Sequence, residues 1–553
     1  MTRRYDAFTA TFEDRQQWTL PQVLAVRARQ QPNKIYLEVP HQSVQLSYSQ
    51  VLQEARTVAG HLIMRGGKRE ELVCIFAHNC AEFVSAWFGA VFAGMVEAPI
   101  NVDYRGNFLA HQVSLLAPRF MVVQAELMSA LLDVKQALES IECLFVIGDA
   151  QRAAPAMAAA EAAGLKSQPF SLLRQRLLQV PALPEAQVQD MSAIFCTSGT
   201  TGPSKGVMTT HAHNYLFADA CVSLTRMKAD DVYYSPLPLF HANAQFLTAY
   251  AAMIAGGRYV MGERFSASAW LGAVRECGAT HTNLLGVMMD YVWKQPPTSE
   301  DADNKLRCVF AAPVNFRIVE EFKKRFDIEA FVDVFGSTEI GIPILTPYNV
   351  PRPQGSFGLA MTDLYDMKLV DPETDQEVPA GELGELVIRP KIAWTLTQGY
   401  YRRPEATVAA FRNLWFHTGD GLRQDSEGWF YWVDRLKDAI RRKGENISSA
   451  EIEQAVLAMD GIIECAAIAV PADEGEGEDE VMLYVVREPG ATIEAEAVWA
   501  WCDSKVPRFA VPRFIEFIGA LPKTPTGKIQ KVQLRNLAAA QPRPKERATP
   551  SKR

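Results

Sequence analysis

Residues 195–206 combine hydroxyl side chains, glycines and one lysine directly after an apolar stretch, a pattern typical of a polyphosphate-binding loop. The segment reads Phe-Cys-Thr-Ser-Gly-Thr-Thr-Gly-Pro-Ser-Lys-Gly. Glycines let backbone N–H groups approach an anion, hydroxyls add donors, and a lysine adds positive charge. The apolar residues 192–195 before it predict a buried strand. The candidate phosphate-binding residues are Thr197, Ser198, Gly199, Thr200, Thr201, Gly202 and Lys205.

The spacing differs from that of the phosphate loop of P-loop ATPases. The lysine follows Gly202 by three positions, and Gly206 stands where a serine or threonine would be required. A Ser/Gly-rich surface loop is the simpler alternative. Such loops rarely connect a buried strand to an ordered Lys-Gly-Val-Met segment, so we favour phosphate binding.

Three single residues elsewhere could also perform chemistry. Glu339 follows an expected strand at 330–334, where a carboxylate is well placed to hold a cation at the carboxyl edge of a sheet. Asp420 lies in His-Thr-Gly-Asp, which predicts a tight turn beside a strand, and its carboxylate can accept two hydrogen bonds from neighbouring hydroxyl groups. Lys528 is projected by a short Pro-Thr-Gly-Lys loop. Taken singly, these residues could equally be a solvated acid, a turn-stabilising aspartate and a solvated lysine.

Composition indicates a soluble globular protein of two or more domains. The chain has 553 residues, 48% hydrophobic and 22% charged, with a formal net charge of −8. This charge argues against bulk binding of nucleic acid but permits a local basic site. The most apolar stretches, 87–95 and 246–255, are too short to span a bilayer, so no membrane span is expected. Nine scattered cysteines without metal-ligand spacing suit reduced thiols in a cytoplasm.

Hydrophobic periodicity predicts an α/β fold. Strands expected at 72–76, 121–124 and 143–147, with helices expected at 48–64 and 81–96, indicate helix-covered, mostly parallel sheets. Further alternation follows, with strands expected at 233–236, 258–261, 281–285, 308–311 and 330–334 and helices expected at 270–277 and 316–326. After about residue 351, short alternating strands predict a small β-barrel-like subdomain. Beyond residue 435 the pattern becomes a compact α+β unit.

Six segments then occur in an order that resembles the adenylate-forming superfamily, which includes acyl-CoA synthetases, nonribosomal-peptide adenylation domains and firefly luciferases. The resemblance covers residues 20–537 and looks most like the crotonobetaine/carnitine–CoA ligase branch and medium-chain acyl-CoA ligases. It implies an AMP-binding domain at 1–436, a mobile C-terminal domain at 437–540, and a tail at 541–553 whose composition predicts disorder. The six segments are 197–206, 335–339, 415–420, 434–438, 443–446 and 525–528.

The resemblance implies a role for each matched position. Glu339, together with Thr197, would hold Mg²⁺, and Thr338 would contact the α-phosphate of ATP. Asp420 and Arg435 would bind the ribose, and Lys528 would serve the adenylation step. The adenine would lie among Phe335, Gly336 and Ala312. The family often has tyrosine where this chain has Phe335, so stacking on adenine is retained while a phenol hydrogen bond is lost. It also often has Gly-Gly-Ala-Pro where this chain has Phe-Ala-Ala-Pro at 310–313.

The second half-reaction is implied to use the C-terminal domain. Lys437 occupies the hinge position, and Lys443, Gly444 and Glu445 would face the pantetheine arm of CoA after rotation. The family often has a glycine pair where this chain has Lys443-Gly444. The lysine side chain would narrow the path of the pantetheine arm. The basic run 441–443 could meet the phosphates of CoA or form a solvated face.

The acyl site is the least defined part. His241 matches a position near the acyl entrance, with a core-packed histidine as the alternative. The expected pocket combines Asn243, Gln245, Leu284, Leu285, Gly286 and Gly341. Its two amides predict a carboxylic acid with polar, branched or cyclic character rather than a long alkyl chain.

These inferences predict a cytoplasmic carboxylate–CoA ligase that uses ATP, Mg²⁺ and CoA and proceeds through an acyl-adenylate. One alternative is a stand-alone adenylating enzyme that loads a carrier-protein thiol. The other is a non-catalytic nucleotide-binding paralogue, which the complete set of site residues disfavours. Nucleic acid is not expected as a partner, and a homodimer is left open.

Overall fold

The computed structural model describes most of the chain. The described residues are 8–197, 204–312, 314–435, 440–442, 445–447, 449–471, 479–506, 510–524 and 527–541, with 544, 546 and 547. They divide into two compact units, which are described separately. The first holds the described residues up to 367 and the segment 388–415, and the second holds 368–387 and the described residues from 416 onwards.

The first unit contains a seven-stranded sheet whose strands are parallel except at one edge. Its order is β14-β13-β12-β10-β11-β1-β2, and only the β1–β2 pairing is antiparallel. The strands are β1 (Ile35–Val39), β2 (Val44–Ser47), β10 (Val232–Ser235), β11 (Arg258–Met261), β12 (His281–Leu285), β13 (Cys308–Ala312) and β14 (Ala330–Val332).

A second seven-stranded sheet of the same unit has the order β7-β6-β5-β3-β4-β8-β9. It is parallel except for the β8–β9 hairpin. The strands are β3 (Leu72–Phe76), β4 (Val96–Pro99), β5 (Phe120–Gln124), β6 (Cys143–Ile147), β7 (Ser167–Pro169), β8 (Met191–Thr197) and β9 (Lys205–Thr210). Every second residue of β3, β5 and β6 is buried against helices. Parallel sheets need such cover because both of their faces are apolar.

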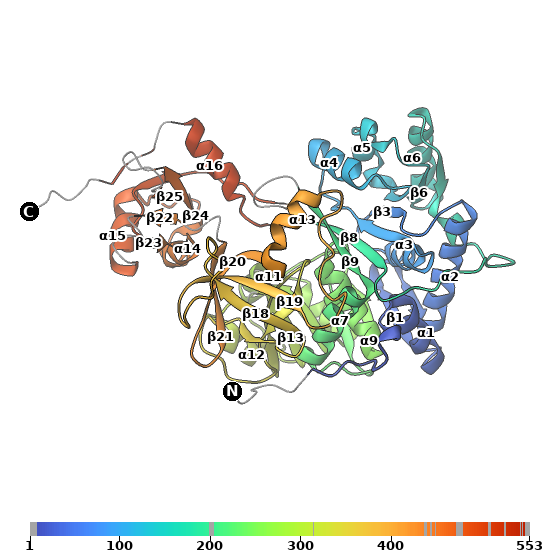
Figure 1. The fold of residues 1–553 in the computed structure, drawn as a ribbon, viewed down its shortest axis with the longest axis horizontal. Coiled ribbons are helices and arrows are strands. Elements are labelled where there is room, and N and C mark those ends of the chain that lie inside the picture. The colour runs from blue at the N-terminus through green and yellow to red at the C-terminus, as the bar shows by residue number, and fades with distance from the viewer. Residues whose placement is uncertain are drawn as a thin grey trace, which may run out of the picture. The chain divides into compact units, whose positions relative to one another are not determined.

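Helices cover both sheets. Figure 1 shows α4, α5 and α6 grouped beside the second sheet, where their apolar faces share one core with it, including Val113, Leu131 and Ala156. The helices α10, α11 and α12 pack on the first sheet around Trp270 and Phe322. The helices of this unit are α1 (Leu20–Gln30), α2 (Tyr48–Met64), α3 (Ala81–Phe92), α4 (Gly106–Leu116), α5 (Met128–Leu132), α6 (Ala150–Ala162), α7 (His211–Thr225), α8 (Ala242–Ala244), α9 (Ala251–Ala255), α10 (Trp270–Cys277), α11 (Gly286–Trp293), α12 (Val319–Phe326) and α13 (Pro404–Ala410).

One helical segment of the first unit has π geometry. It is η6 (Gln245–Tyr250), which connects α8 to α9 and is buried throughout. Such π segments are uncommon and occur often at functional sites. An antiparallel set of three strands completes the unit: β15 (Val334–Ser337), β16 (Gly341–Leu345) and β17 (Gly358–Ala360).

The second unit is smaller and mixes hairpins with helices. The hairpin of β20 (Phe416–Gln424) and β21 (Trp429–Arg435) is antiparallel, as are β22 (Ile440–Arg442) and β23 (Glu445–Ile447). The three-stranded sheet of β24 (Ile462–Pro471), β25 (Asp479–Arg487) and β26 (Phe514–Phe517) packs against α14 (Ser449–Leu457), α15 (Ala495–Lys505) and α16 (Lys531–Ala540). Strands β18 (Tyr365–Val370) and β19 (Gly384–Pro390) each cross a boundary between the units.

The predicted α/β class is confirmed. The strands expected at 72–76, 143–147, 258–261 and 281–285 have the predicted bounds, whereas those expected at 121–124, 233–236, 308–311 and 330–334 differ by one or two residues at one or both ends. The helix predicted at 81–96 was wrong at its end, because α3 stops at Phe92 and Gly94, with φ +69°, reverses the chain into the unpredicted strand β4. The helix predicted at 316–326 begins only at Val319. The domain bounds 1–436, 437–540 and 541–553 stay predictions; within the last, Arg547 forms an ion pair with Asp503.

Two further properties concern the expected environment of the chain. Among the described residues, the helices are all too short or too polar to cross a bilayer. All nine cysteines are free, and none is exposed.

Candidate active site

The predicted phosphate loop connects the two strands of a hairpin rather than a strand and a helix. In the β8–β9 register, Cys196 pairs with Gly206 and Thr197 pairs with Lys205, so the two ends of the loop lie opposite one another. A Cβ atom on Gly206 would stand 2.8 Å from the Ile194 side chain, which favours glycine there. The predicted residues Ser198, Gly199, Thr200, Thr201 and Gly202 lie outside the described residues.

Lys205 and Glu339 meet at the same aromatic ring. The Lys205 Nζ lies 4.5 Å from the centroid of the Tyr400 ring, a cation–π contact. The Tyr400 hydroxyl donates to Glu339 Oε1 at 3.3 Å. The backbone N–H of Tyr400 donates to Thr407 Oγ1 at 2.9 Å, which ties the Tyr400 backbone to α13. The first unit therefore brings a cation and a carboxylate into contact with one buried tyrosine, the cation over its ring and the carboxylate at its hydroxyl.

Glu339 lies in the turn between β15 and β16, which corrects the expectation of a loop after a parallel strand. The parallel strand β14 ends at Val332, and Val334 already begins an antiparallel strand. A Cβ on Gly336 would lie 2.0 Å from the Gly341 carbonyl oxygen, so the close approach of the two strands requires glycine. The predicted adenine residue Phe335 is half-buried on β15, opposite Ile344.

Two residues from other elements hold this turn. His213 of α7 contacts the Thr338 carbonyl through Nε2 at 3.0 Å. Burial lowers the pKa of His213, so the ring is neutral and this nitrogen carries the proton that it donates. The Thr397 N–H donates to the Glu339 carbonyl at 2.9 Å. Both backbone carbonyls of the catalytic candidates Thr338 and Glu339 are thus fixed.

The oxygen atoms of this region suit a magnesium ion that is also bound by phosphates. Mg²⁺ in nucleotide enzymes is usually held by one or two carboxylates, phosphates and water rather than by a complete protein cage. Glu339 provides one partly exposed carboxylate, and Thr197 provides a hydroxyl at the base of the loop. Among the described residues no group of three or more acidic, histidine or cysteine side chains forms a metal cage. The donor set fits the predicted ion.

The acyl candidates form two separate polar pairs. Asn283 of β12 donates through Nδ2 to Asn243 Oδ1 at 2.7 Å, and Asn283 Oδ1 is a buried acceptor without a partner among the described residues. Gln245 is completely buried and bonds to the Leu239 carbonyl and to Glu97. The sequence predicts that this amide lines the acyl pocket. In the structure its N–H group instead bonds to buried protein oxygens.

The remaining acyl and adenine candidates differ in exposure. Leu284 is fully buried in the core beneath the helices of the first sheet, and its place in a pocket lining stays a prediction. Leu285 and Gly286 are partly exposed where β12 passes into α11, and Ala312 ends the neighbouring strand β13. His241 is half-buried, and its ring centroid lies 4.5 Å from that of Phe240. Gly341 has φ +67° and faces Phe217.

In the second unit, Asp420 lies inside strand β20, so the predicted turn was wrong. It is opposite Arg435 in the β20–β21 register, as a shared ribose role would need, although the Arg435 side chain is outside the description. Trp432 Nε1 donates to Asp420 Oδ1 at 3.2 Å. Asp420 is almost completely buried.

A buried glutamate fixes the approach to Asp420. Glu385 Oε1 accepts from the Gly419 N–H at 3.0 Å, and its Oε2 lies 2.8 Å from His417 Nδ1. Gly419 has φ +71°, a conformation that glycine adopts without strain. Thr418 Oγ1 accepts from the Asp420 N–H at 3.1 Å. Glu385 thus sets the backbone from which the Asp420 carboxylate projects.

Lys528 is exposed on a tight loop. The Thr524 N–H donates to the Lys528 carbonyl at 2.7 Å, and the Lys528 N–H donates to Thr524 Oγ1 at 3.1 Å. Gly527, with φ +80°, closes the loop. The predicted hinge and CoA residues Lys437, Lys443 and Gly444 lie outside the described residues, as does the Glu445 side chain. Arg442 of the predicted basic run contacts Glu480 at 2.7 Å, so it is not a simply solvated charge.

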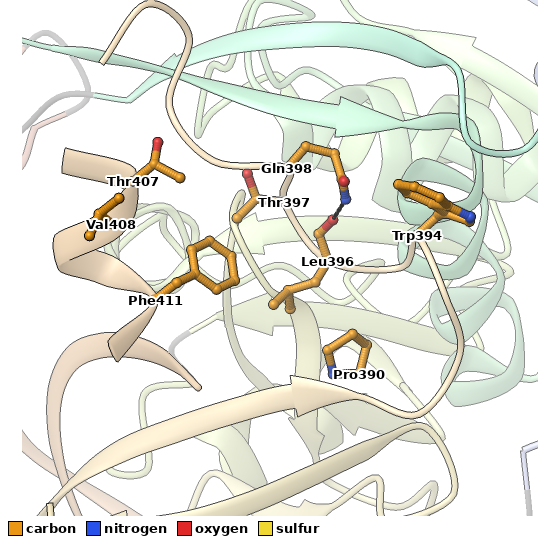
Figure 2. A pocket seen from close by; sticks show the side chains of 8 residues that line it. All are labelled: Pro390, Trp394, Leu396, Thr397, Gln398, Thr407, Val408 and Phe411. Atoms are coloured by element: carbon orange, nitrogen blue, oxygen red, sulfur yellow. Dashed lines mark hydrogen bonds between the residues drawn. The ribbon is translucent and has the colours of Figure 1, made fainter. Parts of the chain in front are cut away.

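The first unit also has an open apolar hollow of about 410 Å³. Figure 2 shows Phe411, Val408 and Thr407 of the α13 region facing the segment with Leu396, where Gln398 bonds back to the Leu396 carbonyl. None of the predicted site residues lines it, so it is not the expected acyl pocket.

The sequence patterns did not identify Tyr400, His213 or Glu385. Each contacts a predicted residue from a distant position in the chain: Tyr400 contacts Glu339, His213 contacts Thr338, and Glu385 contacts Gly419. A local signal existed only for Tyr400, which follows Gly399 shortly before a helix-starting proline at 404.

Comparison with known protein families identifies the family of this chain. The family model described as AMP-binding enzyme matches residues 24–401, which is more than half of the chain. The chain belongs to the AMP-binding enzyme family. The model of the AMP-binding enzyme C-terminal domain matches residues 451–528, a span that ends at Lys528. The predicted resemblance to the adenylate-forming superfamily is therefore confirmed.

Relatives of this AMP-binding enzyme cover nearly its full length. A crotonobetaine/carnitine–CoA ligase of Citrobacter koseri is 31% identical over 498 residues, covering 89% of this chain and 93% of the relative. The protein of the same description from Salmonella paratyphi A is 30% identical over 499 residues, with the same coverage.

Solved structures share the fold. ATP-bound MatB from Rhodopseudomonas palustris has a TM-score of 0.79 at 24% identity, covering 94% of this chain and 99% of that one. The anthranilate CoA ligase AuaEII in complex with anthranoyl-AMP also has a TM-score of 0.79 at 24% identity, covering 95% and 98%. At this identity the likeness establishes the α/β fold of the AMP-binding enzyme and nothing about its substrate.

Proposed function

We propose that this AMP-binding enzyme is a carboxylate–CoA ligase that uses ATP. The carboxylate of the acid attacks the α-phosphorus of ATP, the bond to the β-phosphate oxygen breaks, and pyrophosphate leaves with an acyl-adenylate formed. The CoA thiol then attacks the acyl carbonyl, forming the thioester and releasing AMP. Activation replaces a poor leaving group by a good one. The named ligases among the relatives support this reaction class.

The contact of Lys205 and Glu339 with Tyr400 is the observation that carries the proposal. A cation and a metal-binding carboxylate held 4.5 Å and 3.3 Å from one rigid side chain suit a magnesium-bound polyphosphate. A positioned cation and Mg²⁺ would align pyrophosphate as the leaving group and offset the charge that develops on it. Fixed placement matters because groups that are already oriented need no reorganisation during the reaction.

The individual roles follow from residue chemistry. Glu339 and Thr197 would hold Mg²⁺, while Thr338 would contact the α-phosphate. Asp420 and Arg435 would bind the ribose. Lys528 would neutralise charge between the carboxylate and the α-phosphate, since an ammonium can do so without proton transfer. The remaining assignments are His241 at the acyl entrance, Phe335, Gly336 and Ala312 at the adenine, the loop residues 198–202 with Lys205 at the phosphates, and Lys437, Lys443, Gly444 and Glu445 for the hinge and CoA passage.

The Asn243–Asn283 pair supports a polar acid as the substrate. Asn283 Oδ1 is buried without a partner among the described residues, so a donor on the acyl group would supply a hydrogen bond that these residues leave unmade. We therefore propose a carboxylic acid that carries a hydroxyl, amine or amide N–H group on a short, branched or cyclic skeleton. A long saturated chain would leave the same acceptor unpaired.

The decisive experiment measures acid-dependent exchange of labelled pyrophosphate into ATP, with a panel of polar, aromatic, branched and long-chain saturated acids. The expected result is exchange that needs an acid and Mg²⁺ and is strongest with polar acids. Glu339→Gln is the matched inactive control, because it keeps size and removes the charge. No exchange with any acid would contradict the proposal, and a maximum with long saturated acids would contradict its substrate class.

The acceptor is tested separately. With the best acid, product is measured with free CoA and with a phosphopantetheinylated carrier protein. Thioester on CoA is expected, and loading of the carrier alone would instead identify a stand-alone adenylating enzyme. We also propose a cytoplasmic location and a homodimer, which cell fractionation and light scattering would test.

A further inference from the structure

Glu97 is a completely buried acid that the proposed reaction does not use. It lies on β4, between Val73 of β3 and Ala193 of β8 in the sheet register. Desolvation raises its pKa well above the usual value for a glutamate, and only a hydrogen bond from Gln245 opposes this shift. In the described part of the chain no charged or titratable neighbour contributes to this shift, so no described cation compensates a negative charge here.

The partner of Glu97 is as buried as the acid itself. Gln245 begins the π segment η6, and its Nε2 donates to the Leu239 carbonyl at 2.8 Å and to Glu97 Oε2 at 3.3 Å. The second oxygen of each side chain, Glu97 Oε1 and Gln245 Oε1, is buried without a hydrogen-bond partner among the described residues. Both of these oxygens can only accept hydrogen bonds if the glutamate is ionised.

One proton resolves both unmade bonds. A carboxylic acid donates through its O–H and accepts through its carbonyl oxygen, while a primary amide donates through N–H and accepts through its oxygen. The two groups can therefore pair head to head with two hydrogen bonds. An ionised Glu97 would instead leave an uncompensated charge and an unpaired amide oxygen in the core, each of which is costly.

We propose that Glu97 carries a proton at neutral pH and forms a closed acid–amide pair with Gln245, and that this pair positions the His241–Asn243 segment against the sheet of the phosphate hairpin. Glu97 belongs to the second sheet, next to β8, whereas Gln245 follows the segment that leaves β10 of the first sheet. The pair therefore joins the strand that leads into the phosphate loop to the segment of the acyl candidates.

A second contact supports the positioning role. Asn79, which follows β3, donates to the Leu237 carbonyl at 3.0 Å and accepts from the Leu239 N–H at 2.9 Å. Gln245 completes this clamp at the Leu239 carbonyl, and the Gln245 N–H donates to the His241 carbonyl at 3.2 Å. The segment between β10 and η6 is thus held by two neutral amides, Asn79 directly after a strand of the second sheet and Gln245 of η6. Glu97 is a positioning residue, and its importance for acid binding rests on the proposed function.

Infrared spectroscopy tests the proton directly. The difference spectrum between wild type and Glu97→Gln at neutral pH should contain a protonated carboxylic acid band that is lost in the variant. Subtraction removes the signals of other buried acids such as Asp219 and Asp333, which both proteins share. Loss of an ionised carboxylate band instead would overturn the proposal. This measurement needs no enzyme activity, so it stands even if no acid supports pyrophosphate exchange.

Matched variants test the pair. Glu97→Gln provides an amide that can form the same two bonds, so its melting temperature should match that of wild type and its KM for the acid should stay within about two-fold of the wild-type value. Glu97→Leu is similar in size but leaves Gln245 unpaired, and its KM for the acid should rise roughly ten-fold while KM for ATP changes little. If Glu97→Gln is as impaired as Glu97→Leu, the negative charge matters and the proposal is wrong. Should Glu97→Leu fail to fold, Glu97→Gln and the infrared band still decide.

Discussion

The Tyr400 hydroxyl donates a hydrogen bond to Glu339 Oε1, although the two residues are 61 positions apart in the chain. The same ring lies beneath the ammonium of Lys205 at the end of the phosphate hairpin. Tyr400 therefore orients the proposed metal carboxylate and the proposed phosphate cation together. A residue of this kind affects the site through its neighbours rather than by contact with the reacting atoms.

Replacing Tyr400 by phenylalanine should weaken the binding of Mg²⁺ at Glu339. The ring and its contact with Lys205 remain, while Glu339 loses a donor that orients it. Partners that orient metal ligands typically contribute roughly 10- to 100-fold in metal affinity. We expect the Mg²⁺ concentration for half-maximal pyrophosphate exchange to rise by about 10-fold. Tyr401→Phe is the control, and an equal change in both variants would contradict the role of Tyr400.

Glu385→Ala should weaken nucleotide binding. The change leaves the Gly419 N–H and His417 without their buried acceptor, and a buried unmade bond costs about 1–3 kcal/mol. Because this backbone carries Asp420, KM for ATP should rise by roughly 10-fold, with a smaller effect on KM for the acid. Glu382→Ala removes an exposed acid nearby in the chain and should behave as wild type. A uniform loss across both substrates would point to general unfolding, which a melting curve would reveal.

Lys528→Ala should abolish adenylation and spare the second half-reaction. Its ammonium is proposed to act only while the carboxylate attacks the α-phosphate, so a chemically prepared acyl-adenylate should still react with CoA. Lys523→Ala, from the same loop, removes a cation that pairs with Glu464 and should retain exchange. A bulky substitution at Gly444 should have the opposite effect to Lys528→Ala. Retained adenylation with loss of thioester formation in the Lys528 variant would reverse the assignment, and equal loss of both steps in the Gly444 variant would contradict the proposed CoA passage.

The buried ring of His211 should make the free energy of unfolding depend on pH below 6.5. Burial lowers the pKa of His211 to about 4, and its Nδ1 accepts from the Leu20 N–H at 3.4 Å. The unfolded chain therefore binds more protons than the folded protein between pH 6.5 and about 4, so the free energy of unfolding falls as pH falls through this window. The loss should reach about 3 kcal/mol, from about 1.4 kcal/mol per unit of pKa shift.

Thermal unfolding of His211→Gln tests this sign. The variant has no proton to gain, so its stability should fall less steeply than that of wild type between pH 6.5 and pH 4. The comparison is made as a difference between the two proteins, because other groups titrate in both. Parallel curves would show that the His211 ring is protonated in the folded state as readily as in the unfolded one.

Local patterns predicted the elements and motifs with strong periodicity or unusual composition. Leu72–Phe76 is a strand with the predicted bounds, because an isolated apolar run of five residues has few alternatives. Val96–Pro99 was missed because it directly follows an apolar helix and the pattern alone does not show where that helix ends. The tight turn predicted at His-Thr-Gly-Asp was wrong, because β20 continues from Phe416 to Gln424 although Gly419 has φ +71°.

The supporting contacts could not be predicted from one sequence. Glu385 reads as an ordinary acid in a Gly-Glu-rich strand, and only pairing with β20 residues brings it to Gly419. In the sequence, Glu97 is a single charged residue within an apolar run. Only its burial beside Gln245 indicates a positioning role. Motif residues can be predicted from their types and spacing. The residues that hold them in place can be identified only from their contacts in the structure.

The thiol of Cys196 has a chemical consequence for an enzyme that makes activated acyl groups. It adjoins Thr197 on β8, and burial raises its pKa to about 12. At neutral pH the sulfur stays protonated, and a protonated thiol is a poor nucleophile. An electrophilic mixed anhydride formed beside this hairpin would therefore meet no competing thiolate from Cys196, which protects the catalyst from acylating itself.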